Sequence, residues 1–297
     1  MPPLDRAPAA WVPRLQVIGA SLLFSTAGAA IKACSLSGWQ VAGVRAGVAA
    51  LAVGALVPAA RRGWTRRVGA VAVVYAVTVI LFVQANKLTT AASAIFIQAA
   101  SPLFLVLLGP ALLKEPVRRR DLLFLLALAA GLSLFFVSLE RPATTAPDPR
   151  LGNVVAAGSC LSVALMLAGL RWLERSSPGA AMPVVVAGNL LAFLACLPFA
   201  WPFTGARAAD WMILAFLGVF QIGLGYVFLL RGMRHLTALE AALFLNLEPV
   251  LNPVWAWMLH GERPGAWALL GGGLILGAVL ARTWLDGRAA ARMASAA

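Results

Sequence analysis

The residue with the clearest chemical potential in this sequence is Glu248, a carboxylate within a long apolar segment. The segment begins near residue 238, so a rise of about 1.5 Å per residue places Glu248 about 15 Å into a helix, near the centre of a bilayer core. An isolated charge at that depth costs about 3 kcal/mol or more. We predict that Glu248 faces a wet cavity, holds a proton or meets a cation. The alternative is that it satisfies backbone groups loosened by Pro249 and Pro253.

Four-residue spacing places further polar and aromatic side chains on the helix face that carries Glu248. This face carries Glu240, Phe244, Glu248 and Asn252, with Trp255 three positions beyond Asn252. We predict that the face forms one wall of the cavity and that Phe244, Asn252 and Trp255 contact a small-molecule ligand there. Glu240 lies so close to the start of the segment that it can reach the membrane interface instead.

Arg45 is a basic residue well inside an apolar segment, and it lies between Gly43 and Gly47. Small residues at this spacing permit close contact between helices. One prediction is a charge pair between Arg45 and Glu248. The other is that the arginine side chain snorkels to the outer membrane interface, about six residues away.

Other residues that we assign to ligand binding lie at helical spacings or beside mid-segment prolines and glycines. They are Tyr75, Thr78, Phe82, Gln98, Ser101, Gln221, Tyr226 and Asn246. Rings and hydroxyls on one stripe suit an amphipathic ligand, and the amides can orient a carboxylate or an amino group. Each amide can equally form a hydrogen bond between helices. We expect Pro102, Pro249 and Pro253 to bend the helices that hold them.

The elements that position these residues must be membrane helices. Apolar residues make up 61% of the 297 residues and charged residues only 12%, which excludes an ordinary soluble domain. A helix needs roughly 20 apolar residues to cross a bilayer. Ten segments meet this requirement, near 15–31, 39–58, 68–86, 90–113, 121–139, 151–170, 181–200, 210–230, 238–259 and 265–284. The predicted fold class is therefore an all-α integral membrane protein with ten transmembrane helices.

Basic residues are distributed unevenly over the loops between these segments. One alternate set of loops holds six of the 24, namely Lys32, Lys87, Arg141, Arg150, Arg207 and Arg263. Apart from Arg45, the remaining 17 lie on the other set, which includes both termini. Because basic loops stay on the cytoplasmic side, we predict cytoplasmic N and C termini in a bacterial inner membrane. The net charge of +13 comes from short clusters and forms no stripe, so we expect no nucleic-acid partner.

The chain contains an internal repeat. LTTAASAIFIQAASP (88–102) resembles LTALEAALFLNLEP (236–249), and the same offset aligns Glu115 with Glu262. We predict two five-helix halves, residues 1–142 and 143–297. Since five is odd, the second half enters the membrane from the opposite side. Inverted repeats of this kind hold a substrate site near the midplane in many transporters.

The residues that carry this pattern resemble the drug/metabolite transporter superfamily, specifically its EamA-type ten-helix members. The match is clearest over AALFLNLEPVLNPVWAWMLHGERPGAWALLGGGLILGAV (241–279), with support from GVRAG (43–47) and the stretch 102–115. The resemblance implies a transporter, and relatives that export amino acids, including aromatic ones, suggest the cargo. The first copy has LLKEP where the second has HGERP, so its Gly-Glu signature is incomplete.

The sequence predicts a secondary transporter, with no enzymatic activity and no cofactor or metal. No Lys-Ser or Lys-Thr follows the glycines of the last segment to bind a nucleotide. His235 and His260 lie at opposite membrane faces in the predicted topology, and the sequence contains no closely spaced acidic metal motif. The alternatives are a lipid-modifying membrane enzyme and a scaffold that transports nothing. Expected partners are a small-molecule substrate and the lipid bilayer. Gly271, Gly272, Gly273 and Gly277 favour tight packing either within the chain or in a homodimer.

Overall fold

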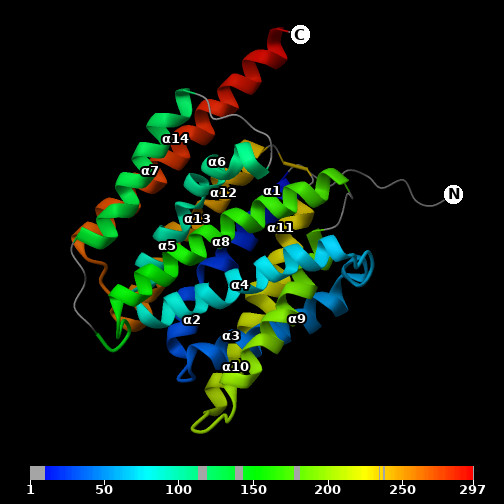
Figure 1. The fold of residues 1–297 in the computed structure, drawn as a ribbon, viewed down its shortest axis with the longest axis vertical. Helices are drawn as coiled ribbons and strands as arrows, with labels where there is room; N and C mark the ends of the chain where they lie inside the picture. Colours follow the sequence, from blue (N-terminus) through cyan, green and yellow to red (C-terminus); the bar gives the residue numbers. More distant parts are fainter. Residues whose placement is uncertain are drawn as a thin grey trace, which may run out of the picture.

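A computed structural model describes residues 11–112, 119–137, 143–176, 181–233, 235–236 and 238–296. These residues are almost entirely helical (Figure 1). Among them no β-strand occurs, and an isolated bridge joins Ala143 to Ala146. The predicted all-α class is confirmed.

Helices account for most of the described residues in the first half of the chain. They are α1 (Trp11–Ser25), α2 (Ala27–Ala33), α3 (Gly38–Leu56), the 3₁₀ helix η1 (Pro58–Arg61), α4 (Arg66–Leu88), α5 (Ala91–Ala99), α6 (Ser101–Leu112) and α7 (Arg119–Val137). Polar caps fix several of their starts. The Ser37 hydroxyl accepts a hydrogen bond from the backbone N–H of Gln40, whose side chain accepts from the Ser37 N–H. Thr65 and Thr90 cap α4 and α5 in the same way through their hydroxyls.

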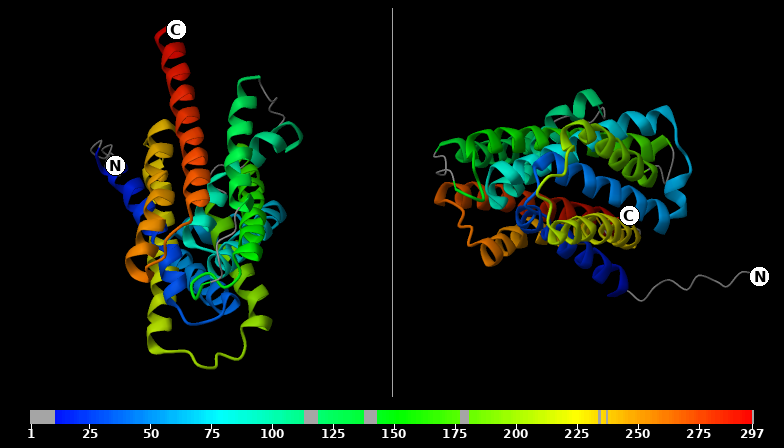
Figure 2. Two further views of the ribbon diagram at one scale, coloured as in Figure 1. Left: turned by 90° about the vertical axis from the view of Figure 1, so that its left-hand side faces the viewer. Right: turned by 90° about the horizontal axis from the view of Figure 1, so that it is seen from below.

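The second half repeats this order. Its elements are α8 (Pro149–Ser176), α9 (Ala181–Ala200), α10 (Ala208–Ala215), the π-helical segment η2 (Phe216–Leu224), α11 (Gly225–Met233), α12 (Ala238–Leu245), α13 (Leu247–His260) and α14 (Ala266–Ala296). In Figure 2 the C-terminal part of α14 extends beyond one end of the bundle, and the loop between α9 and α10 lies at the other end.

Eight helices of the described chain are long and apolar enough to cross a membrane. The two other predicted spans correspond to α7, whose apolar part Asp121–Val137 is shorter, and to the pair α12 and α13. The multi-pass membrane architecture is confirmed, but the count of ten is not. The pair α12 and α13 falls short because Glu240, Asn246, Glu248 and Asn252 make it less apolar than α5 with α6, which is also interrupted but counts as a span.

Interruptions occur at matching places in the two halves. One separates α5 from α6 at Ala100, and the other separates α12 from α13 at Asn246. Each lies a few residues before a proline, Pro102 or Pro249, which has no N–H for the preceding turn. The carbonyl of Leu245, four residues before Pro249, instead accepts a hydrogen bond from the Ser21 hydroxyl. In contrast, α13 continues through Pro253.

The packing of the helices has the pattern of a twofold relation between the halves. In the two halves, α1 corresponds to α8, and α4 corresponds to α11. The contact between α4 and α8 is therefore matched by the contact between α11 and α1. The pairs α3 with α9 and α7 with α14 correspond to themselves, and both are in contact as well (Figure 1). Two copies of one unit therefore assemble face to face, as an inverted repeat requires.

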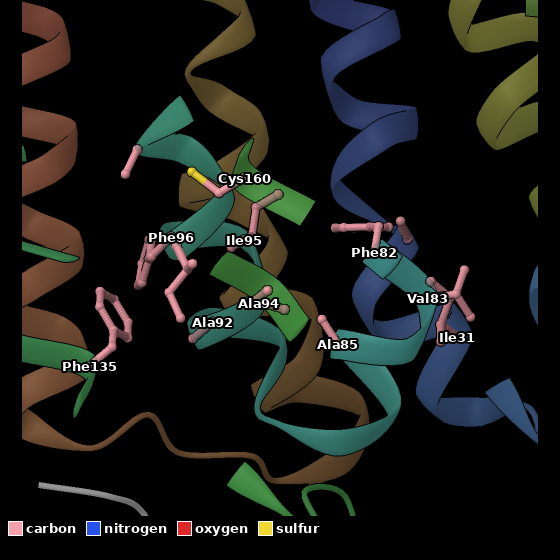
Figure 3. Close-up of a cluster of buried hydrophobic side chains, with 14 of the residues drawn as sticks. Ile31, Phe82, Val83, Ala85, Ala92, Ala94, Ile95, Phe96, Phe135 and Cys160 are labelled. Atoms are coloured by element: carbon pink, nitrogen blue, oxygen red, sulfur yellow. The ribbon is translucent and has the colours of Figure 1, made fainter. Parts of the chain in front are cut away.

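The main apolar core lies where α2, α4, α5 and α8 meet. Figure 3 shows Ile31, Phe82, Ile95, Phe96 and Cys160 among the buried side chains of this cluster. These residues come from both halves, so the core joins the repeats. It also fixes Phe82, which lies next to the cavity described below.

Candidate functional site

A cavity of about 200 Å³ lies between the two halves. Eight elements supply its lining, which consists of Phe24, Arg45, Tyr75, Thr78, Val79, Phe82, Gln98, Val163, Met166, Gln221, Ile222, Tyr226 and Glu248. Arg45 and Gln221 lie near the middle of the spans Gly38–Leu56 and Ala208–Met233. The cavity is therefore located near the centre of the membrane-spanning region.

Most residues that the sequence assigned to cargo binding line this cavity. The seven are Tyr75, Thr78, Phe82, Gln98, Gln221, Tyr226 and Glu248, and Arg45 accompanies them. Ser101, Phe244, Asn246, Asn252 and Trp255 are not part of its lining. The face predicted from four-residue spacing thus reaches the cavity only at Glu248. The interruption at Asn246 separates Glu240 and Phe244 on α12 from Glu248 on α13, whereas Asn252 and Trp255 share α13 with Glu248 and turn toward other helices.

Hydrogen bonds hold the polar residues on the α4 side of the cavity. Asn189 of α9 donates its side-chain N–H to the Tyr75 hydroxyl at 3.1 Å, and both side chains are buried. Gly188 permits this arrangement, because a Cβ atom there would lie 2.4 Å from the Tyr75 ring. Thr78 hydrogen-bonds the Ser162 hydroxyl of α8 at 2.7 Å. These residues are therefore positioned before any cargo arrives.

Gln98 and the aromatic residues complete the wall. The Gln98 side chain donates to the Ser159 hydroxyl of α8 at 2.8 Å. Phe24 and Tyr226 meet edge to face with ring centroids 5.4 Å apart, and Tyr226 lies 6.2 Å from the Tyr75 ring. Such a set of rings offers an apolar surface with hydroxyl groups at its edge.

Arg45 is 3% exposed and lines the cavity, so its side chain does not extend to the membrane interface. Its Nε and Nη1 atoms contact no hydrogen-bond acceptor in the described part of the chain. Its guanidinium carbon lies 6.0 Å from the centroid of the Phe82 ring, at the outer limit of a cation–π contact. The close approach of η2 at Gly218, where a Cβ atom would lie 3.0 Å from the Arg45 carbonyl oxygen, fixes this part of α3.

Glu248 lines the same cavity from α13, two residues beyond the interruption at Asn246. It is partly exposed, and the described residues provide neither an ion pair nor a hydrogen bond to its carboxylate. Arg45 and Glu248 therefore share the cavity without forming the predicted charge pair in this conformation. An anionic and a cationic group both remain available to a third molecule.

Two of the residues outside the lining serve contacts between helices. Asn252 is fully buried and packs on Gly28 of α2, where an added Cβ atom would lie 2.4 Å from the amide oxygen. The Trp255 indole N–H donates to the Ser25 hydroxyl at 3.0 Å. Both side chains thus connect α13 to the first span.

The remaining three lie away from the cavity for local reasons. The Asn246 side chain donates to the backbone carbonyl of Ala242 one turn earlier, at 2.7 Å. Ser101 is buried at the start of α6, and Phe244 is half-buried on α12. A role for them in cargo binding stays a prediction.

Sequence reasoning missed five apolar lining residues, which are Phe24, Val79, Val163, Met166 and Ile222. An apolar side chain in an apolar segment carries no signal of its own. Val79 follows Thr78 directly, and Ile222 follows Gln221, so only these polar neighbours indicated that the two apolar residues lie near the site. Phe24 had none, because α1 carries no residue that was assigned to the site.

At one end of the bundle, which we call the linker end, the helices are joined by residues 33–38, 88–91, 143–149, 200–208 and 260–266. Buried polar groups close this end. Glu262 and Lys32 form an ion pair at 3.5 Å, and both side chains are about 3% exposed or less. The Glu262 carboxylate also accepts the N–H of Ala91 at the start of α5, at 2.6 Å. Lys32 donates to the backbone carbonyls of Thr89, at 2.7 Å, and Thr145. Glu115, its predicted counterpart in the repeat, lies outside the described residues.

A second buried carboxylate at the linker end joins the first two spans to α10. Asp210 accepts hydrogen bonds from the Ser35 N–H at 2.7 Å, the Ser35 hydroxyl at 2.6 Å and the Arg207 N–H at 2.9 Å. Next to it, Lys87 donates to the carbonyl of Cys34 at 2.6 Å. Burial is the main reason why the pKa of the Cys34 thiol is raised above its usual value.

A second cavity of about 460 Å³ opens at the linker end, between α5, the residues 143–146 and the turn after α13. Glu262 lines it together with Thr90, His260 and Arg263. In the described residues, no group of three or more His, Cys, Asp or Glu side chains has the arrangement of a metal site.

Comparison with known proteins identifies relatives of this architecture. The profile of the EamA-like transporter family matches residues 13–137 and 150–283. Two curated relatives, the pseudopaline exporters of Pseudomonas aeruginosa strains UCBPP-PA14 and PAO1, are each 28% identical over 186 residues. These matches cover 61% of this chain and 62% of the relatives' length. A solved crystal structure shares the fold, with a TM-score of 0.62 at 20% identity, and the match covers 93% of this chain and 98% of the other.

Proposed function

Because the chain belongs to the EamA-like transporter family, we propose that it is a secondary transporter that exports a small amphipathic metabolite through the central cavity. Amino acids are the cargo we propose first. The observation that carries the proposal is a cavity near the middle of the spans, lined by rings and polar groups of both halves. Transporters built from inverted repeats bind their substrates at this location.

Alternating access supplies the mechanism that we propose. The halves 1–142 and 143–297 rock against each other, and the interruptions at Ala100 and Asn246 allow α5 with α6 and α12 with α13 to bend. The Lys32–Glu262 contact forms the barrier at the linker end in this conformation. Opening of that end requires the ion pair and its hydrogen bonds to separate.

Direction, location and assembly belong to the same proposal. The relatives that are named exporters support export, and the distribution of basic residues supports cytoplasmic termini in a bacterial inner membrane. A homodimer has support from Gly273 and Gly277, where an added Cβ atom would meet open space. Gly271 and Gly272 instead pack within the chain, on Gly131 and Phe96.

Purified protein in liposomes tests the transport function directly. Labelled threonine, methionine and aromatic amino acids are presented to liposomes with protein and to empty liposomes. We expect at least one of these amino acids to cross faster with protein present. Failure of all of them to exceed the empty-liposome rate would remove the amino-acid assignment.

Glu248→Gln tests the coupling role of the cavity carboxylate. We expect the flux of the unmodified protein to depend on pH and that of the variant to be lower and nearly independent of pH. Glu240→Gln is the matched control, because Glu240 lies on α12 and pairs with Arg14 at 2.7 Å outside the cavity lining. Equal pH profiles in all three proteins would exclude coupling through Glu248.

A further inference from the structure

The Arg45 guanidinium has hydrogen-bond donors that no described residue satisfies. It lies in the central cavity, is 3% exposed, and has two nitrogen atoms, Nε and Nη1, without an acceptor in the described chain. Burying a guanidinium is expensive unless an anion or several acceptors compensate it. The contact with Phe82 at 6.0 Å compensates only a small part. An anion that enters the cavity could accept hydrogen bonds from these two nitrogen atoms and compensate the buried charge.

Acceptors for a cationic group lie in the same cavity. The Glu248 carboxylate is partly exposed, and the Oε1 atom of Gln221, whose side chain is buried, meets no donor among the described residues. Glu248 belongs to α13, which packs on α1, α2 and α5, whereas Arg45 belongs to α3, which packs on α4, α9 and η2. The opposite charges thus come from different sides of the cavity and do not pair with each other.

We propose that Arg45 binds the carboxylate of the cargo and that Glu248 binds its ammonium group, so that the cavity selects small zwitterions of the α-amino carboxylate type. This inference rests on the proposed function, since it names the cargo of the same cavity. The rings of Phe24 and Tyr226 then receive the apolar part of the cargo.

Size and geometry support a small zwitterion. The volume of about 200 Å³ is less than the roughly 300 Å³ at which pockets for drug-sized ligands begin. A planar guanidinium can donate two parallel N–H groups to one carboxylate, which a lysine ammonium cannot match. A cargo with both charges would satisfy groups on both sides of the cavity at once. A cargo with only one charge would leave the other side unpaired.

Changes to the ligand test the proposal without any change to the protein. Binding to the detergent-solubilised protein is measured for phenylalanine, phenylalaninamide and N-acetylphenylalanine, and for the matching methionine and threonine series. We expect at least one acid to bind about 10- to 100-fold more tightly than its amide, the range of a hydrogen bond to a charged group. N-acetylation, which removes the ammonium charge, weakens binding by a similar factor.

Substitutions at Arg45 then locate the preference. In Arg45→Gln we expect the acid to bind only as well as its amide, within about twofold, while the affinity for the amide stays unchanged. Arg45→Lys keeps the charge and retains part of the preference. The matched control is Arg288→Gln on the exposed surface of α14, which leaves the preference intact. A purely structural role of Arg45 would lower the affinities for acid and amide together.

The outcomes separate this inference from the proposed function. If no acid is favoured over its amide, because both bind alike or because none binds, the inference is overturned. Labelled phenylalaninamide that crosses liposomes as fast as phenylalanine would overturn it too, yet transport through the cavity would stand. If neither compound and none of the other amino acids crosses faster than in empty liposomes, the amino-acid function fails as well.

Discussion

The ion pair between Lys32 and Glu262 leads to a quantitative prediction about the linker end. Glu262→Gln removes the negative charge but keeps an oxygen that can accept the Ala91 N–H. Breaking a buried ion pair by neutralising one partner costs about 3–5 kcal/mol. Both side chains of this pair are about 3% exposed or less, so the buried value applies. Because one hydrogen bond survives, we take the lower figure of about 3 kcal/mol, which raises the opening equilibrium about 100-fold.

The assay uses a reporter thiol behind the ion pair. Ser93 is 2% exposed in the first turn of α5, and a Ser93→Cys substitution changes one atom. The three native cysteines are replaced by alanine, and the reaction of the reporter with a bulky maleimide is followed over time. We expect Glu262→Gln to accelerate this reaction strongly and to lower the melting temperature.

Glu240→Gln is the matched control for the same chemical change in an exposed pair. The Arg14–Glu240 side chains are 52% and 30% exposed, so the loss should be at most about 1 kcal/mol. A labelling rate in Glu262→Gln within about threefold of the control value would correspond to less than 1 kcal/mol. That result would refute the view that this ion pair holds the linker end closed.

Three further predictions concern positioning, attachment and titration. Gly188→Ala should displace Tyr75 at a cost of about 1–3 kcal/mol and reduce transport in liposomes, whereas Gly69→Ala, where a Cβ atom meets nothing within 4 Å, should not. Asp210→Ala leaves its three donors without an acceptor and should destabilise the protein to thermal unfolding by about 3 kcal/mol; an unchanged melting temperature would contradict this. Burial raises the pKa of the Cys34 thiol, so its alkylation rate, measured by mass spectrometry, should still increase as the pH rises past about 8.5, where the alkylation rate in the unfolded chain levels off. Because the thiol ionises more readily in the unfolded chain, the free energy of unfolding should fall over the same pH interval.

Much of the architecture was predictable because the length and apolar composition of membrane helices identify them in a sequence. The matching interruptions at Ala100 and Asn246 were foreshadowed by Pro102 and Pro249 in the repeat. The count of ten spans was not confirmed, because α7 is short and because the polar residues of α12 and α13 lower the hydropathy of that pair.

Candidate site residues were predictable where polarity stood out against an apolar background. Glu248, Gln221 and Tyr75 all line the cavity. Asn252 and Trp255 do not, since their side chains contact Gly28 and Ser25 of the first span instead. Apolar lining residues carry no such contrast, and the distance between two charges depends on how the helices pack.

The π-helical segment η2 affects how relatives of this chain can differ. Its hydrogen bonds close wider turns than those of an α-helix, which accommodates an additional residue. Deleting one residue there would turn every later side chain of the span by about 100° relative to the earlier ones. Gln221 and Tyr226 would then no longer point into the same space. A one-residue gap at this place in an alignment should therefore change what a homologue carries, even when every aligned residue is identical.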